Sequence, residues 1–268
     1  MRYLSAALAG FVLAHMAARA QAEPEPPGFT PEHVRAAQRD PRYFTLDPES
    51  IEVVKLSQAS PGRIAPKAPA IPPQSPVVVI ERIVNIARTV WKIIEENKPV
   101  VDVETCFATA LPEGVAHWDQ LSGWRPPEGA VYGLRAENLY GVKVIDLRFQ
   151  VLRTHGGSYK GKGKYLHAVM IEPLKIEVAW GYRFGMKAEV PSVVNVGTAE
   201  DPVAGMIARL GWSIDTVLKH SEGKNVFYLQ GDGVFRELGG PFKKPALASG
   251  ARALGKARRT VLSLNLSR

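Results

Sequence analysis

The sequence predicts an all-β protein: an antiparallel β-sandwich, with an Ig-like topology as one possibility, preceded by one amphipathic α-helix. Two observations support this fold class. From residue 100 onward, apolar side chains recur at every second position, which is the repeat of strands with one buried face and one solvated face. These predicted strands also follow one another without helical patterns between them, which favours a sandwich over an α/β fold.

Residues 1–22 have the pattern of a cleaved secretory signal. Arg2 precedes an apolar stretch over residues 4–14, and small residues suit cleavage after Ala20 or Ala22. The stretch is shorter than the roughly 20 residues of a membrane-spanning helix, so we expect export, without a transmembrane span in the mature chain, rather than anchoring. The single cysteine, Cys106, forms no internal disulfide and lies in a β-rich run where we expect burial. These features favour a periplasmic or secreted protein of the bacterial cell envelope.

Residues 23–76 are rich in proline and predict an extended spacer. Within the spacer, the pair Thr30-Pro31 indicates the start of a short helix that runs to about Arg39. Residues 51–56 predict a short strand.

The predicted amphipathic helix begins at the pair Ser75-Pro76 and ends at Asn97, before Lys98-Pro99. Its polar side carries both signs of charge, so we expect it to cover the sandwich; the alternative is a helix that binds a membrane or a partner. Its apolar positions recur at helical spacing: Ile80, Ile83, Val84, Ala87, Val90, Trp91 and Ile94.

Two long segments predict strands with irregularities. Residues 174–190 alternate strictly, and a strand of this length would extend about 56 Å, so we expect a bend at Gly181 or Gly185. In the strand over residues 141–154 the apolar face changes sides between Val144 and Ile145, which indicates a β-bulge. Further strands are predicted at residues 130–136, 165–171, 203–214, 226–230 and 234–238.

Two turns between these strands are recognisable. Gly231-Asp232-Gly233 predicts a hairpin turn before the last strand. Residues 195–198, Asn-Val-Gly-Thr, resemble the Asn-x-Gly-Thr turn that joins strands in bacterial Ig-like export and adhesion domains. This resemblance covers a short segment and implies an Ig-like topology but no particular activity.

The net charge of +8 lies almost entirely in residues 239–268, which carry seven Lys or Arg and no Asp or Glu. Residues 77–238, the predicted helix and sandwich domain, carry equal numbers of basic and acidic side chains. Charge confined to a terminus predicts a solvated, disordered tail that makes salt-sensitive contacts, and it disfavours nucleic-acid binding by the body. The candidate contacts to an envelope protein or an acidic envelope polymer are Lys243, Lys244, Arg252, Lys256, Arg258 and Arg259.

A candidate ligand site combines two segments. Residues 117–127 hold two tryptophans in an irregular stretch, beside polar groups that could bind sugar hydroxyls. Residues 156–162 predict a glycine- and lysine-rich hairpin tip that could contact an anionic polymer. The alternative is that the indoles are buried and the lysines only solvated. The candidate residues are Trp118, Asp119, Trp124, Arg125, Tyr159, Lys160 and Lys162.

Catalytic and cofactor sites are not indicated. The segment 156–162 fits the phosphate-loop pattern G-x-x-x-x-G-K, but Gly163 follows where a Ser or Thr would hold Mg²⁺. His155 and His167 lie on the two arms of the hairpin without a third metal ligand. Because no Ser-His-Asp set or carboxylate pair stands out, a hydrolase is the least favoured class. We therefore expect a non-catalytic, exported envelope interaction or accessory protein without a cofactor, or alternatively a carbohydrate- or lipid-binding module.

Overall fold

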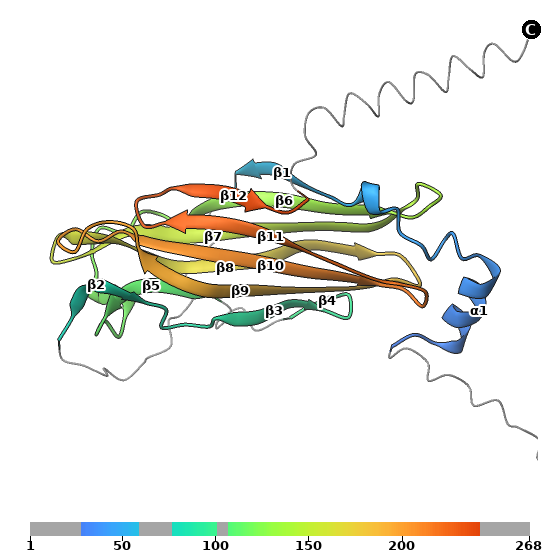
Figure 1. The fold of residues 1–268 in the computed structure, drawn as a ribbon, viewed down its shortest axis with the longest axis horizontal. Coiled ribbons are helices and arrows are strands. Elements are labelled where there is room, and N and C mark those ends of the chain that lie inside the picture. Colours follow the sequence, from blue (N-terminus) through green and yellow to red (C-terminus); the bar gives the residue numbers. More distant parts are fainter. Residues whose placement is uncertain (1–27, 59–76, 101–106, 242–268) are drawn as a thin grey trace, which may run out of the picture.

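A computed structural model describes residues 28–58, 77–100 and 107–241, and these form two antiparallel six-stranded sheets stacked face to face (Figure 1). The order of strands is β1-β6-β7-β8-β5-β2 in the first sheet and β12-β11-β10-β9-β3-β4 in the second. This architecture confirms the predicted all-β sandwich, and the one α-helix of the described residues is α1 rather than the predicted amphipathic helix.

The bounds of the elements are as follows. The helix α1 spans Pro31–Arg39, and short 3-10 helices cover Pro48–Ser50 and Trp118–Gln120. The first sheet contains β1 (Glu52–Gln58), β2 (Val79–Val84), β5 (Ala108–Glu113), β6 (Glu128–Glu137), β7 (Lys143–Tyr159) and β8 (Lys162–Val178). The second sheet contains β3 (Val90–Glu95), β4 (Lys98–Pro99), β9 (Arg183–Asn195), β10 (Ala204–Asp215), β11 (His220–Gln230) and β12 (Phe235–Gly239).

The hydrophobic core lies between the sheets. Tyr132 of β6 stacks on Phe149 of β7 and meets Phe227 of β11, with ring centroids 5.4 Å apart in both pairs. All three rings are fully buried. Each such side chain contributes about 1.5–3 kcal/mol on burial, so the period-two pattern of apolar residues selects the inward face of every strand.

The predicted helix over residues 75–97 is wrong, because this stretch holds β2 and β3, which belong to different sheets. Between them, the Oδ1 atom of Asn85 accepts hydrogen bonds from the backbone N–H groups of Thr109 (2.9 Å) and Ala87 (3.1 Å). Val and Ile crowd both strands, and these β-branched residues favour strands over helices. Two short strands around an irregular turn imitate the spacing of an amphipathic helix.

The predicted β-bulge of the long strands is present, whereas the predicted single strand over residues 174–190 is wrong. Ala136 pairs with Ile145 but Glu137 pairs with Lys143, so Val144 is the extra residue of the predicted bulge. The segment 174–190 is not one bent strand, because β8 ends at Val178 and β9 begins at Arg183 in the other sheet. Gly181 turns the chain at φ +83°, where the Phe44 ring leaves no space for a Cβ atom.

The N-terminal elements agree with the sequence. Helix α1 is capped by the Thr30 side chain and ends at Arg39, as predicted. Strand β1, predicted at residues 51–56, pairs with β6, so part of the predicted spacer belongs to the sandwich. The signal sequence, the proline-rich residues 59–76, Cys106 and the basic tail lie outside the described residues. None of the helical segments in the described ranges has the length and apolar character needed to cross a membrane.

Asp146 of β7 is a buried carboxylate on the outer side of the first sheet. Its Oδ2 atom accepts hydrogen bonds from the Nζ atoms of Lys143 (2.8 Å) and Lys175 (3.0 Å), and Arg135 Nε lies 3.8 Å from its Oδ1 atom. The hydrogen bond from Lys143 is the main cause that lowers the pKa of Asp146 from 3.8 to about 2; the Lys175 hydrogen bond adds to it, and burial opposes both.

We expect the substitution Asp146→Asn to lower the free energy of unfolding at neutral pH by about 1–2 kcal/mol, allowing for the half-exposed lysines. The pKa is lowered by folding, so the stabilisation is complete above the unfolded pKa and is lost as the pH falls through the folded pKa of about 2. Urea unfolding of both proteins across this range measures the difference. A difference that does not shrink towards pH 2 would contradict the prediction, and Glu177→Gln is the exposed control.

Candidate functional site

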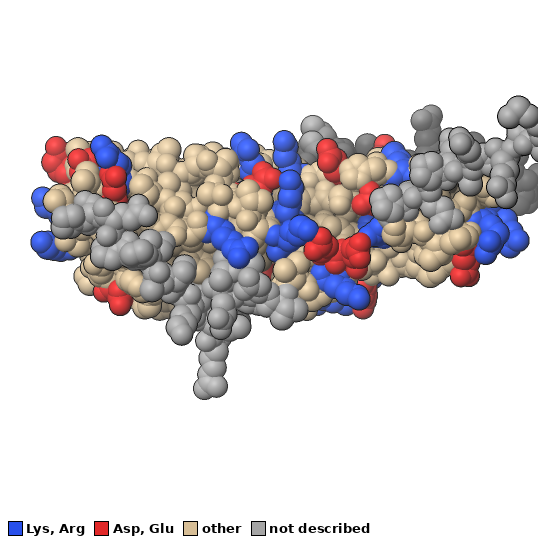
Figure 2. Space-filling model, turned by 90° about the horizontal axis from the view of Figure 1, so that it is seen from below, with Lys and Arg blue, Asp and Glu red and all other residues tan. Residues whose placement is uncertain are grey.

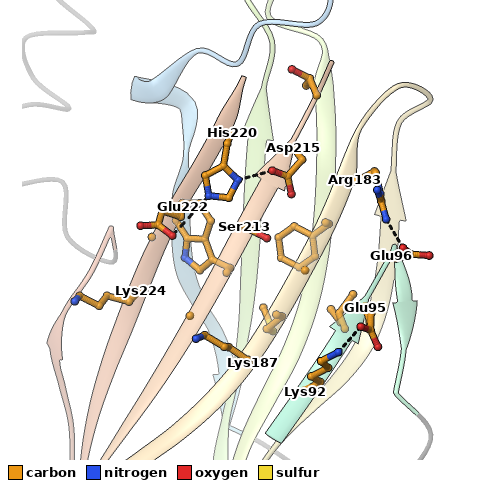
Figure 3. Close-up of a pocket in the computed structure, with 18 of the residues that line it drawn as sticks. Lys92, Glu95, Glu96, Arg183, Lys187, Ser213, Asp215, His220, Glu222 and Lys224 are labelled. Carbon is orange, nitrogen blue, oxygen red and sulfur yellow. Dashed lines mark hydrogen bonds and ion pairs between the residues drawn. The ribbon is translucent and has the colours of Figure 1, made fainter. Parts of the chain in front are cut away.

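A groove of about 1130 Å³ crosses the outer face of the second sheet at the end that carries α1. Strands β9, β10 and β11 form its floor, and β3, Phe29 and the β10–β11 turn form its rim. Figure 3 shows charged side chains from β3, β9, β10 and β11 arranged around this floor. Seen from the side of β3, basic and acidic side chains lie next to each other over the middle of the molecule (Figure 2).

The floor is low because its outward positions carry small residues. Ser213 of β10 pairs with Gly185 of β9, and Gly211 lies at the next outward position of β10. On the inward side of the same strands, Trp212 and Met186 are buried and hold the floor against the core. A sheet whose outward residues lack large side chains presents its backbone to a ligand.

A row of lysines crosses this floor. Gly211 pairs with Lys187 of β9 and Lys224 of β11, and Lys187 pairs in turn with Lys92 of β3. The aliphatic part of Lys187 passes over Gly211, where an added Cβ atom would lie 3.5 Å from the lysine Cε atom. Figure 3 shows the lysine row, Lys92, Lys187 and Lys224, along one side of the groove. Arg209 adds a further cation at the next outward position of β10.

The half of the groove nearer α1 carries several carboxylates. Glu222 pairs with Ser213 across the floor, and Asp215 pairs with His220 at the end of β10. Glu95 forms an ion pair with Lys92, and Glu96 forms one with Arg183. The groove therefore has a lysine-rich half over the middle of the sheet and, beside it, a half in which carboxylates alternate with Arg183, Lys219 and His220.

The charges of the groove stabilise one another. The hydrogen bond from Lys187 lowers the pKa of Glu189, 2.9 Å away, and the charges of Arg209 and Lys224 lower it further. The hydrogen bond to Glu189 in turn raises the pKa of Lys187. The hydrogen bond to Asp215 raises the pKa of His220. These shifts favour the ionised forms of Lys187 and Glu189 and extend the pH range in which His220 is a cation.

The groove lacks the arrangement of a nucleophilic site. Ser213, Asp215 and His220 lie on the same face, and the Nδ1 atom of His220 bonds Asp215, but its Nε2 atom is not bonded to Ser213. Its Nε2 atom faces Glu222 at 3.6 Å, so the imidazole is held between two carboxylates. Within the described ranges, no group of three or more His, Cys, Asp and Glu side chains could hold a metal ion.

The two segments of the sequence-predicted ligand site lie together at the opposite end of the sandwich. Ser122 and Ser158 exchange backbone hydrogen bonds of 2.9 and 2.8 Å, and the backbone N–H of Arg125 donates to the carbonyl of His155 at 2.8 Å. Asp119, Arg125, Lys160 and Lys162 are exposed, and the Nζ atom of Lys160 lies over the Tyr159 ring.

The tryptophans of this loop pack on the protein. Trp118 stacks on His167 with ring centroids 5.3 Å apart, and Trp124 lies 5.9 Å from the same ring. The indole N–H of Trp124 donates to the carbonyl of Trp118 at 3.1 Å. Both indoles are half-buried. Because His167 stacks on Trp118, it covers one face of that indole and is not available as a ligand group.

His155 and His167 do not face one another. The Nε2 atom of His155 contacts a carboxylate oxygen of Glu128 at 2.5 Å, whereas His167 lies among aromatic rings, with Phe107 5.7 Å away. The predicted contacts of the tail, Lys243 to Arg259, lie outside the described residues.

The groove was not predicted from the sequence, although a signal for it is present. Outward positions of β9 read Arg183, Gly185, Lys187 and Glu189, and those of β10 read Arg209, Gly211, Ser213 and Asp215. Glycine at outward positions of two adjacent strands indicates a low floor between charged rows. The pairing of the strands, which aligns these positions, is not visible in the sequence. Comparisons with family models, curated proteins and solved structures found no match to this chain.

Proposed function

We propose that the protein is a non-catalytic, exported interaction module of the bacterial envelope that binds an acidic polymer along the lysine row of the second sheet. The observation that supports this function is the alignment of Lys92, Lys187 and Lys224 across a floor made of Gly211 and its neighbours. The signal-like N-terminus and the basic tail of the sequence support the envelope assignment.

The dimensions of the row suit an extended polyanion. Neighbouring strands lie about 4.8 Å apart, so a row from β3 to β11 spans roughly 14 Å and can meet several anionic groups in succession. The lysine side chains are exposed, so their contacts are long-range and sensitive to salt. Lys92 and Lys187 form ion pairs with Glu95 and Glu189, whereas Lys224 and Arg209 act on Glu189 only through their charge and can turn towards a ligand.

The test of this function is binding to polygalacturonate, a polymer of uronic acids. We expect the double substitution Lys187→Glu with Lys224→Glu to weaken binding at low salt by at least roughly tenfold, because two attractions become repulsions. The matched control is Lys55→Glu on β1, an exposed lysine of the other sheet. Isothermal titration calorimetry at low and high salt measures both affinities.

The basic tail could bind the same polymer, so its contribution is measured separately. The chain without residues 239–268 is measured with the native groove and with the doubly substituted groove. The groove function is supported if the substitutions weaken binding in both backgrounds. Equal losses from the Lys55→Glu control, or binding that disappears only with the tail, would contradict it.

A further inference from the structure

Three turns at the α1 end of the sandwich present large apolar side chains to solvent. The turns connect β6 to β7, β8 to β9 and β10 to β11, and all three lie at the same end because β7 pairs with β8 and β9 pairs with β10 there (Figure 1). The exposed side chains, each with 43% to 51% of its surface accessible, are Leu139, Tyr140, Val142, Trp180 and Leu218. We call these residues the apolar tip. Soluble proteins seldom gather such residues at one place without a partner.

The turns that carry the apolar tip are held rigidly. Asn138 is buried, and its Oδ1 atom accepts hydrogen bonds from the backbone N–H groups of Tyr140 (3.0 Å) and Val142 (3.1 Å). The hydroxyl of Thr216, also buried, accepts from the backbone N–H of Leu218 at 3.2 Å. These hydrogen bonds fix the backbone of the two turns, so the apolar side chains that the turns carry stay exposed in the folded protein.

The aromatic members of the tip have polar contacts on the protein side. The Tyr140 hydroxyl donates to Asp40 Oδ1 at 2.9 Å, and the Arg42 guanidinium lies over its ring. The Trp180 ring packs on His33 of α1 at 4.5 Å. Tyr and Trp rings that combine an apolar body with a polar edge are enriched where a protein meets the interface of a bilayer.

The course of the chain identifies a membrane as the occupant of this surface. Gly28, the first described residue, lies against Arg183 at the start of β9, so the chain enters the sandwich at the α1 end. The apolar stretch that ends at residue 14 is therefore within about 50 Å of Gly28, even with the intervening chain fully extended. Until the predicted signal is cleaved, this tether starts at the α1 end of the sandwich, whose opposite end is about 56 Å away along β7, and so favours contact of the α1 end with a membrane that holds the stretch.

We infer that the apolar tip docks on the surface of a lipid bilayer, with the side chains of its three turns inserted among the lipid headgroups. Exposed Arg35, Arg39 and Arg42 beside the tip would face lipid phosphates. Docking through the tip leaves the lysine row on the side of the molecule, although Leu218 of the tip also lies at the rim of the groove.

Quenching of Trp180 by lipids brominated in the acyl chains tests the contact directly, because it reports the depth of one indole regardless of how else the chain is attached. The full-length protein is mixed with phosphatidylcholine vesicles, with and without phosphatidylglycerol. We expect quenching in the native chain and its loss in Trp180→Phe, which keeps a ring against His33. Trp124→Phe, at the opposite end, is the matched control and should retain the quenching.

A second variant addresses the other turns. The double substitution Leu139→Ser with Val142→Ser changes two exposed apolar side chains. We expect it to weaken binding of the protein to vesicles, so that half-maximal quenching of Trp180 needs at least a tenfold higher lipid concentration. Three outcomes would overturn the inference: vesicle-bound protein without quenching, quenching that persists in Trp180→Phe, or no binding to vesicles. A concentration-dependent dimer in sedimentation velocity that Leu139→Ser with Val142→Ser dissolves would instead assign the tip to self-association.

Discussion

Replacing Gly129 by alanine is expected to lower the free energy of unfolding by about 3 kcal/mol, and valine at this position should prevent folding. Gly129 lies near the start of β6 and pairs with Leu152 of β7. A Cβ atom at this position would lie 1.8 Å from the carbonyl oxygen of Val151 and 3.0 Å from the Cα atom of Leu152. Both are backbone atoms of a central strand, so the clash is relieved only by moving β6 away from β7.

Gly133 on the same strand provides the matched control. Its Cβ atom would meet the end of the Leu56 side chain at 3.3 Å, and this exposed side chain can rotate away. We expect Gly133→Ala to change the unfolding free energy by less than about 1 kcal/mol, since reduced freedom of the unfolded chain offsets a mild contact. Urea unfolding followed by circular dichroism compares the two variants. A loss of unfolding free energy for Gly129→Ala that is as small as that for Gly133→Ala would show that β6 tolerates a side chain at Gly129.

The sandwich was predictable because its strands follow a simple physical rule. Alternate residues of β9 and β10 are buried between the sheets, and this burial selects the period of two that the sequence displays. The bulge at Val144 was also predictable, since one extra residue in a strand moves the apolar pattern to the other face. Local chemistry sufficed for α1, where Thr30 caps the helix and Pro31 begins it.

Long-range pairing decided the features that the sequence did not reveal. Residues 79–95 follow a helical period, but the Asn85 side chain bonds to Thr109, far along the chain, and separates two strands. The lysine row depends on register, because Lys92, Lys187 and Lys224 are aligned only when four strands pair at Gly211 and Lys187. Likewise, the apolar tip gathers residues from three turns that are separate in the sequence. The pattern of one sequence shows which face of a sheet a residue occupies, but it does not show which residues of other strands lie beside it on that face.

Acidification is expected to destabilise the protein through His167, which is buried in an aromatic cluster beside the Trp118 loop. Its ring contacts Phe107, Trp118 and Trp124, and its Nδ1 atom has no hydrogen-bond partner among the described residues. Burial lowers the pKa of His167 from 6.5 to about 4. Because the folded state resists protonation, the unfolded chain binds more protons between these values, and stability falls as the pH decreases through this range.

The size of this effect separates His167 from the other titrating groups. The shift corresponds to about 3 kcal/mol that is present above the unfolded pKa and lost as the pH falls to about 4. The substitution His167→Phe keeps a ring against Trp118 and removes the titration, so the stability of the variant relative to the native protein should rise by about 3 kcal/mol on acidification. The pKa of the exposed His220 is raised by Asp215, so its contribution to stability has the opposite pH dependence: it is present at low pH and is lost as the pH rises through the folded pKa.

Urea unfolding of native protein, His167→Phe and His220→Gln between about pH 7 and pH 4 distinguishes the two histidines. Parallel curves for the native protein and His167→Phe would show that the ring is protonated as readily in the folded protein as in the unfolded chain.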